Sequence, residues 1–118
     1  AGTNNSNLKN NYSDVKILFE DKVINTEIKF MGVLIGDYSR IAIGTNLNTG
    51  TYISIGSNVF NYDLKNRYIK PFSWGMDKKV NFDKFIDTIG IMKERRSQNI
   101  SKAEKQYLQF LYGKLKSN

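Results

Sequence analysis

The chain has 118 residues, 25% charged and 40% hydrophobic, which is one domain with a modest core. It carries 18 Lys and Arg against 11 Asp and Glu, a net charge of +7. Cysteine and histidine are absent, which excludes disulfides, a thiolate or histidine-ligated metal site and a histidine general base; we expect no metal site. The longest apolar run, residues 30–35, is far below the ~20 residues of a membrane span, so we expect a cytoplasmic chain without membrane contact.

The first thirty residues predict a polar loop followed by a strand pair. The chain opens on Ala1 rather than Met, and we expect a fragment or a processed chain with more protein before it. Residues 1–14 are rich in Asn and predict a loop. Residues 15–20 alternate in polarity, Asp21-Lys22 suits a turn, and residues 23–28 suit a returning strand.

Residues 35–60 carry a period of six. Branched apolar residues recur at every sixth position, Ser or Thr follows each of the first four by four positions, and three glycines share another phase. The three series are Ile35, Ile41, Leu47, Ile53 and Val59; Ser39, Thr45, Thr51 and Ser57; and Gly44, Gly50 and Gly56. This period is typical of hexapeptide-repeat β-helices, in which each hexad supplies one short strand and one corner. An ordinary β-meander with the same spacing is the alternative.

The period predicts a mainly β fold: a single-stranded left-handed parallel β-helix with a C-terminal α-helical tail. We divide the chain into a coil remnant with a strand excursion (1–34), hexapeptide coils (35–60), an aromatic loop (61–80) and a two-helix tail (81–118). The loop contains the only Pro and the only Trp, and we interpret Trp74 as a packing anchor.

The tail predicts two amphipathic helices that pack against the β part. Asn81 is expected to cap the first, and Ser101 opens a capping box for the second. The expected buried faces are Phe82, Phe85, Ile86, Ile89 and Met92 in the first helix, and Ala103, Tyr107, Phe110, Leu111 and Leu115 in the second.

Residues 1–75 resemble the left-handed β-helix acyltransferases. The match is closest to the bifunctional UDP-N-acetylglucosamine diphosphorylase / glucosamine-1-phosphate N-acetyltransferase family. The resembling segments are Ala1-Gly2-Thr3, Asn7-Leu8-Lys9, Val15-Lys16-Ile17, Gly32-Val33-Leu34-Ile35-Gly36-Asp37, Asn48-Thr49-Gly50-Thr51 and Pro71-Phe72-Ser73-Trp74-Gly75.

The resemblance implies acetyl transfer from acetyl-CoA to the amine of a glucosamine-1-phosphate-like sugar, in a homotrimer. It also implies upstream coils and a missing nucleotidyltransferase domain, to which any Mg²⁺ would belong. Asn7 would orient the reacting groups and contact substrate or acetyl-CoA, and Lys16 and Lys9 would bind substrate, with Lys16 at the sugar phosphate. Lys9, Arg40 and the surface cluster Lys65-Asn66-Arg67 would meet coenzyme A phosphates. The family's His and Tyr would precede this chain, so these residues alone are expected to be inactive.

Four departures from the family pattern bear on the acyl acceptor. Leu8 replaces a Tyr, Ser13 stands where a Lys is usual, and Ile43 and Asn61 replace a Ser and a small Ala. They favour an alternative, a non-catalytic β-helix that only trimerises a nucleotidyltransferase. A second alternative is nucleic-acid binding, suggested by the pI of about 9.6 and by 7 Tyr, 7 Phe and 1 Trp. The basic residues are scattered and form no nucleic-acid motif, so we expect no nucleic-acid partner.

Overall fold

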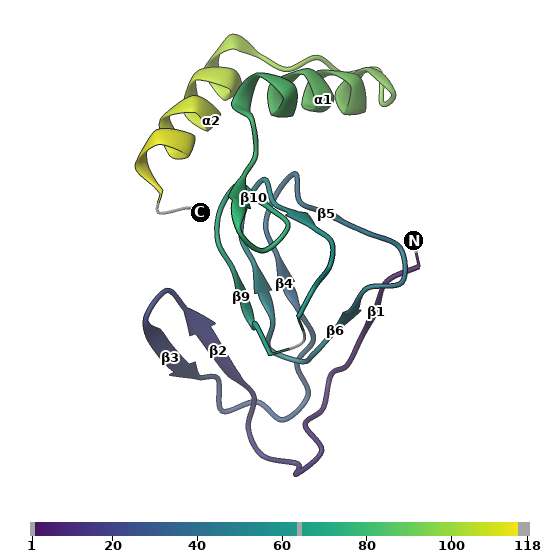
Figure 1. The fold of residues 1–118 in the computed structure, drawn as a ribbon, viewed down its shortest axis with the longest axis vertical. Coiled ribbons are helices and arrows are strands. Elements are labelled where there is room, and N and C mark those ends of the chain that lie inside the picture. Colours follow the sequence, from purple (N-terminus) through teal and green to yellow (C-terminus); the bar gives the residue numbers. More distant parts are fainter. Residues whose placement is uncertain (1, 64, 116–118) are drawn as a thin grey trace.

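The computed structural model describes residues 2–63 and 65–115, so Ala1 of the first resembling segment lies outside the described residues. Short strands form the body, two helices lie across one end, and a hairpin projects at the other (Figure 1). The strands are β1 (Asn4–Asn5), β2 (Lys16–Phe19), β3 (Lys22–Asn25), β4 (Leu34–Ile35), β5 (Arg40–Ile41), β6 (Asn46–Leu47), β7 (Tyr52–Ile53), β8 (Asn58–Val59), β9 (Tyr68–Ile69), β10 (Ser73–Trp74) and β11 (Lys78–Lys79), and the helices are α1 (Phe82–Glu94) and α2 (Lys102–Lys114).

The expectation of a left-handed β-helix is wrong. The described strands form small sheets of order β1-β6, β2-β3, β4-β7-β9 and β11-β10-β8-β5, with parallel and antiparallel pairs, and no closed or solenoid structure. The six-residue period fixes the spacing of short strands, but it does not fix how many strands stack. Here the polar segment 61–67 and the antiparallel strand β11 interrupt the series.

The period of six nevertheless appears in the strand register. Leu34 pairs with Tyr52 and Arg40 pairs with Asn58 in parallel, each across eighteen positions, which is three hexads. The next interval shortens to sixteen, because Tyr52 pairs with Tyr68 across the 61–67 segment. Residues one hexad apart therefore lie in different sheets, and residues three hexads apart lie side by side.

The branched apolar series forms the core of the β part only in its later members. Leu47, Ile53 and Val59 are buried with Ile69, whereas Ile41 is half-buried and Ile35 is 53% exposed. Strands β4 and β5 lie at sheet edges, so their apolar residues lack a covering neighbour on that side.

Glycines and hydroxyl side chains shape the corners between these strands. Gly44, Gly50 and Gly56 all have positive φ, between 69° and 78°, where a side chain would be strained. Ser57 Oγ donates to the carbonyl oxygen of Lys70 at 2.8 Å, and Ser39 Oγ donates to that of Ser54 at 2.8 Å. These hydroxyls satisfy backbone carbonyls at corners, where no strand partner is present.

The expected strand pair forms the hairpin of β2 and β3, in antiparallel register with Ile17 opposite Ile24. Val15 and Ile17 are buried against the β part. Phe19 stacks on Tyr52 with ring centroids 5.7 Å apart and meets Tyr68 edge-on at 5.9 Å. An aromatic cluster therefore fixes the hairpin to β7 and β9.

The helices form a second core around Phe72, which is fully buried. Asn81 caps α1 as expected by accepting the backbone N–H of Lys84 at 3.1 Å, and Phe85, Ile86 and Ile89 are buried. Met92, placed on the same face by its spacing, is 38% exposed.

Ser101 caps α2 as expected, but the predicted buried face of that helix is only partly right, because Leu111 and Leu115 pack against the second core and the other members do not. The fully buried residue is Leu108, while Tyr107 and Phe110 are 60% and 56% exposed. Leu108, Leu111 and Tyr112 pack in the core cluster to which α1 also contributes, so the buried side of α2 is centred on Leu108 rather than on Tyr107.

An ion pair also links the start of α2 to the end of α1. Glu104 would complete the capping box, but its carboxylate instead binds Lys93 Nζ at 2.8 Å and accepts the Tyr38 hydroxyl. The hydrogen bonds from Lys93 and Tyr38 lower the pKa of Glu104, and burial raises the pKa of Tyr38. The three side chains join α2 to α1 and to the loop before β5.

Candidate functional site: a polar groove beside the hairpin

Seven residues from three segments line a groove of about 330 Å³ where the N-terminal segment passes the base of the hairpin. They are Ser6, Leu8, Lys9, Asn10, Asn48, Thr49 and Arg67. Two cations, two hydroxyls and two amides thus converge, and none of these lining residues is acidic. We call this the polar groove.

Arg67 builds one wall of the polar groove by joining distant backbone segments. Its Nη2 donates to the carbonyl oxygen of Lys16 at 2.5 Å and to that of Thr49 at 3.1 Å. Its buried Nε has no hydrogen-bond partner among the described residues. The guanidinium therefore bonds neutral oxygens, and its charge remains available to an anion in the groove.

Hydrogen bonds between the first segment and the hexad strands fix the opposite wall. The backbone N–H of Thr49 donates to Ser6 Oγ at 2.9 Å, and Ser6 N–H donates to the Leu47 carbonyl at 3.0 Å. The Thr49 hydroxyl donates to the Met31 carbonyl, and Met31 N–H donates to the Asn7 carbonyl at 3.0 Å. These bonds hold Ser6 and Lys9 beside Arg67 although the segments are far apart in sequence.

Three of the four residues singled out in the sequence lie around this groove. Lys9 lines it, and Asn7 is an exposed residue between lining residues Ser6 and Leu8. Lys16 takes part through its backbone carbonyl, which Arg67 binds, and its side chain is exposed on β2. Arg40 lies on β5 and lines a different groove, beside α1. The fold therefore does not bring Asn7 and Arg40 into one site.

Arg67 is the groove residue whose importance the sequence did not indicate. It stood out only as part of the surface cluster Lys65-Asn66-Arg67. Its partners are backbone oxygens 51 and 18 positions away, and such bonds leave no side-chain pattern in the sequence. Arg67 directly precedes β9, and the pairing of Tyr68 with Tyr52 on β7 brings Arg67 close to the groove.

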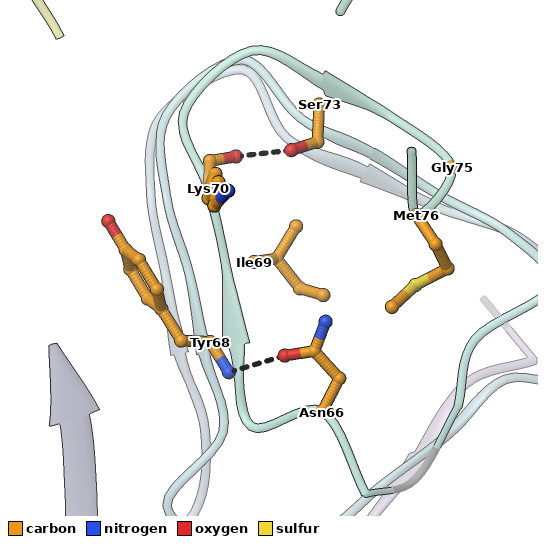
Figure 2. Close-up of a pocket in the computed structure, with 7 residues that line it drawn as sticks. All are labelled: Asn66, Tyr68, Ile69, Lys70, Ser73, Gly75 and Met76. Carbon is orange, nitrogen blue, oxygen red and sulfur yellow. Dashed lines mark hydrogen bonds between the residues drawn. The ribbon is translucent and has the colours of Figure 1, made fainter. Parts of the chain in front are cut away.

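A smaller hollow of about 130 Å³ lies inside the last turn of the β part, next to β9 and β10 (Figure 2). Ile69 and Met76 point into it. Its rim is held by Asn66 Oδ1, which accepts Tyr68 N–H at 3.2 Å, and by Ser73 Oγ, which donates to the Lys70 carbonyl at 2.7 Å. The rim groups bond one another, and Ile69 and Met76 occupy the inner side, so we interpret this hollow as a packing feature rather than a site.

Chemically, the polar groove suits binding and positioning of a phosphorylated, hydroxyl-rich ligand. Its cations can form charge-assisted hydrogen bonds with a phosphate, and its hydroxyls and amides can form hydrogen bonds with sugar hydroxyls. Lys9 and Arg67 are the charged side chains among its lining residues. In residues 2–63 and 65–115 no group of three or more acidic side chains could hold a metal ion.

The search for related proteins found no matching family model, curated protein or solved structure. Among the described residues, neither helix has the length or the apolar character that a membrane crossing requires.

Proposed function

We propose that the polar groove binds an amino-sugar phosphate such as glucosamine-1-phosphate. The convergence of Lys9 and Arg67 with two hydroxyls and two amides, without a carboxylate, is the observation that carries this proposal. A phosphate would lie against the two cations, and the sugar hydroxyls would bond Ser6 and Asn48. The resemblance of residues 1–75 to sugar-phosphate acetyltransferases supports the same ligand class.

The reaction proposed with this ligand is acetyl transfer from acetyl-CoA to the sugar amine, as the acyltransferase-type part of a sugar-nucleotide enzyme. Asn7, exposed beside the groove, would donate hydrogen bonds from its amide to the thioester carbonyl and hold it in line with the amine. The groove offers binding and orientation, and a base from outside its lining residues would remove the proton.

A non-catalytic role in assembling a nucleotidyltransferase is the second candidate. The polar groove favours it in one respect, because its lining residues include no carboxylate to act as general base at neutral pH. Such a module would bind the sugar phosphate without acetylating it.

Binding of the sugar phosphate tests the proposal on this chain. Glucosamine-1-phosphate titrated calorimetrically should bind, and Lys9→Ala should weaken binding about fivefold to tenfold, because a charge-assisted contact to phosphate is lost. Lys105→Ala, an exposed lysine on α2, is the matched control and should bind as the parent does. Equal binding by both variants would remove Lys9 from the site, and no binding by the parent would end the proposal.

Acetyl transfer is tested separately, by release of coenzyme A thiol from acetyl-CoA in the presence of glucosamine-1-phosphate and the full-length protein. Asn7→Ala should lower the rate by one to three orders of magnitude, the effect of losing one transition-state donor. Asn99→Ala, at an exposed position between the helices, is the control. Binding of the sugar phosphate without thiol release would favour the non-catalytic candidate.

A further inference from the structure

A row of outward side chains crosses the sheet of β5, β8 and β10. Arg40 is in register with Asn58, and Asn58 is in register with Trp74. Paired residues of neighbouring strands point to the same face, so these side chains lie in one row, about two strand spacings or ~9.5 Å from end to end. The next residues, Ile41 and Val59, turn toward the core.

Helix α1 turns this row into a groove of about 540 Å³. Lys84, from the first turn of α1, lines the groove together with Arg40 and Trp74, while Val80 and Phe85 provide apolar lining. No acidic residue is among the lining residues. We call this the tryptophan groove.

Two of the three basic side chains of this groove form no ion pair within the described residues. Among the described residues, Arg40 and Lys84 have no ion pair, and the ion pair that is present joins Lys93 to Glu104. Lys79, the third basic residue of the groove, is by contrast engaged: its Nζ donates to the Tyr112 carbonyl at 2.9 Å and lies 3.7 Å from the centre of that ring.

Trp74 offers an aromatic surface beside these cations. The indole is 48% exposed, and Phe60 meets it edge-on with ring centroids 5.3 Å apart. The backbone around it is fixed as well, since Gly75 N–H donates to the Asn58 carbonyl at 2.9 Å. A large aromatic side chain that is held in place but half open to solvent can stack with a planar ring at low entropic cost.

We propose that the tryptophan groove binds a nucleoside phosphate, with the base stacked on Trp74 and the phosphate between Arg40 and Lys84. An aromatic face next to two uncompensated cations matches a planar base linked to an anion. Free nucleotides and coenzyme A share this chemistry. The lining residues of this groove and of the polar groove do not overlap.

The single tryptophan of the chain makes the test direct. ADP and coenzyme A, each titrated against the protein, should quench the Trp74 fluorescence saturably, and rising salt should weaken binding. Arg40→Ala and Lys84→Ala should each raise Kd about tenfold. Lys105→Ala on α2 is the control, and it should leave Kd unchanged.

Three results would overturn the proposal. The first is that neither ADP nor coenzyme A binds. The second is that Arg40→Ala and Lys84→Ala bind as Lys105→Ala does. The third is that stacking contributes nothing, which either full affinity of Trp74→Leu in calorimetry or equally tight binding of inorganic phosphate and ADP would show.

Comparing the affinities of ADP and coenzyme A also shows whether a free nucleotide or coenzyme A is the natural occupant. Binding of ADP and coenzyme A with equal affinity supports a site for free nucleotides, and tighter binding of coenzyme A supports the coenzyme as the occupant. Glucosamine-1-phosphate binding should be unchanged in Arg40→Ala, so a failed nucleotide site and a failed polar groove give different results.

Discussion

Replacing Phe72 with alanine is expected to lower the free energy of unfolding by about 3–5 kcal/mol, the largest effect expected of any single truncation in the chain. The Phe72 ring is fully buried between the β part and the helices. It meets Phe85 edge-on at 5.5 Å and Tyr112 at 5.2 Å. Alanine would leave a cavity where both helices contact the β part.

The backbone of Phe72 limits how far this cavity can close. Its N–H donates to the Ile55 carbonyl at 2.8 Å, and its own carbonyl accepts the Val80 N–H at 2.8 Å. The chain is therefore held from both sides, and the helices cannot settle into the space without breaking these bonds. Relaxation is small, which places the cost in the upper part of the range for a Phe truncation.

Urea unfolding followed by far-UV circular dichroism measures the effect. Phe30→Ala is the matched control, because Phe30 is 67% exposed and its truncation should change stability by less than about 0.5 kcal/mol. If the two variants unfold at similar urea concentrations, Phe72 does not hold the helices to the β part.

The six-residue period predicted local spacing better than it predicted the fold. It correctly indicated short strands, corner glycines with positive φ and buried Leu47, Ile53 and Val59. It could not indicate closure, because closure depends on how many strands stack and on the segments that come after them in the chain. The antiparallel strand β11 and the sixteen-residue interval into β9 are tertiary outcomes without a periodic signal.

The helices show the same limit. Asn81 and Ser101 were predicted as caps because capping is decided by a few neighbouring residues. The buried face of α2 was predicted only in part, with Leu111 and Leu115 packed but Tyr107 and Phe110 exposed, because packing against other elements decides it. Lys93 and Tyr38 lie on other elements, and their bonds to Glu104 compete with the capping box.

The candidate sites were predictable only where side chains themselves carried the signal. Lys9 was singled out through the resemblance of the segment Asn7-Leu8-Lys9, and it lies in the polar groove. Arg67 acts through backbone oxygens, and the row of Arg40, Asn58 and Trp74 depends on strand register. Trp74, interpreted from the sequence as a packing anchor, does contact Phe60 but leaves half of its indole exposed.

The second large effect is expected for Gly50→Ala, which should destabilise the chain by about 2–5 kcal/mol and disturb the polar groove. Gly50 has φ of 77°, and a Cβ there would lie 2.5 Å from Arg67 Nη2. It would also lie 2.7 Å from the Lys16 carbonyl oxygen and 2.7 Å from a Val15 methyl carbon. One added carbon would thus push on the bonds that join Arg67 to the hairpin.

Gly44→Ala distinguishes the strain of a side chain at positive φ from the steric contacts of an added Cβ. Gly44 has nearly the same φ, 78°, but no atom lies within 4 Å of a Cβ built there. Its alanine variant should cost only the conformational strain, about 1–2 kcal/mol, and should bind glucosamine-1-phosphate as the parent does. Gly50→Ala should lose further stability and several-fold in affinity, measured by urea unfolding and calorimetry. Equal losses in the two variants would mean that Arg67 does not depend on the close approach at Gly50, and the wall of the polar groove would then be more adaptable than its two hydrogen bonds suggest.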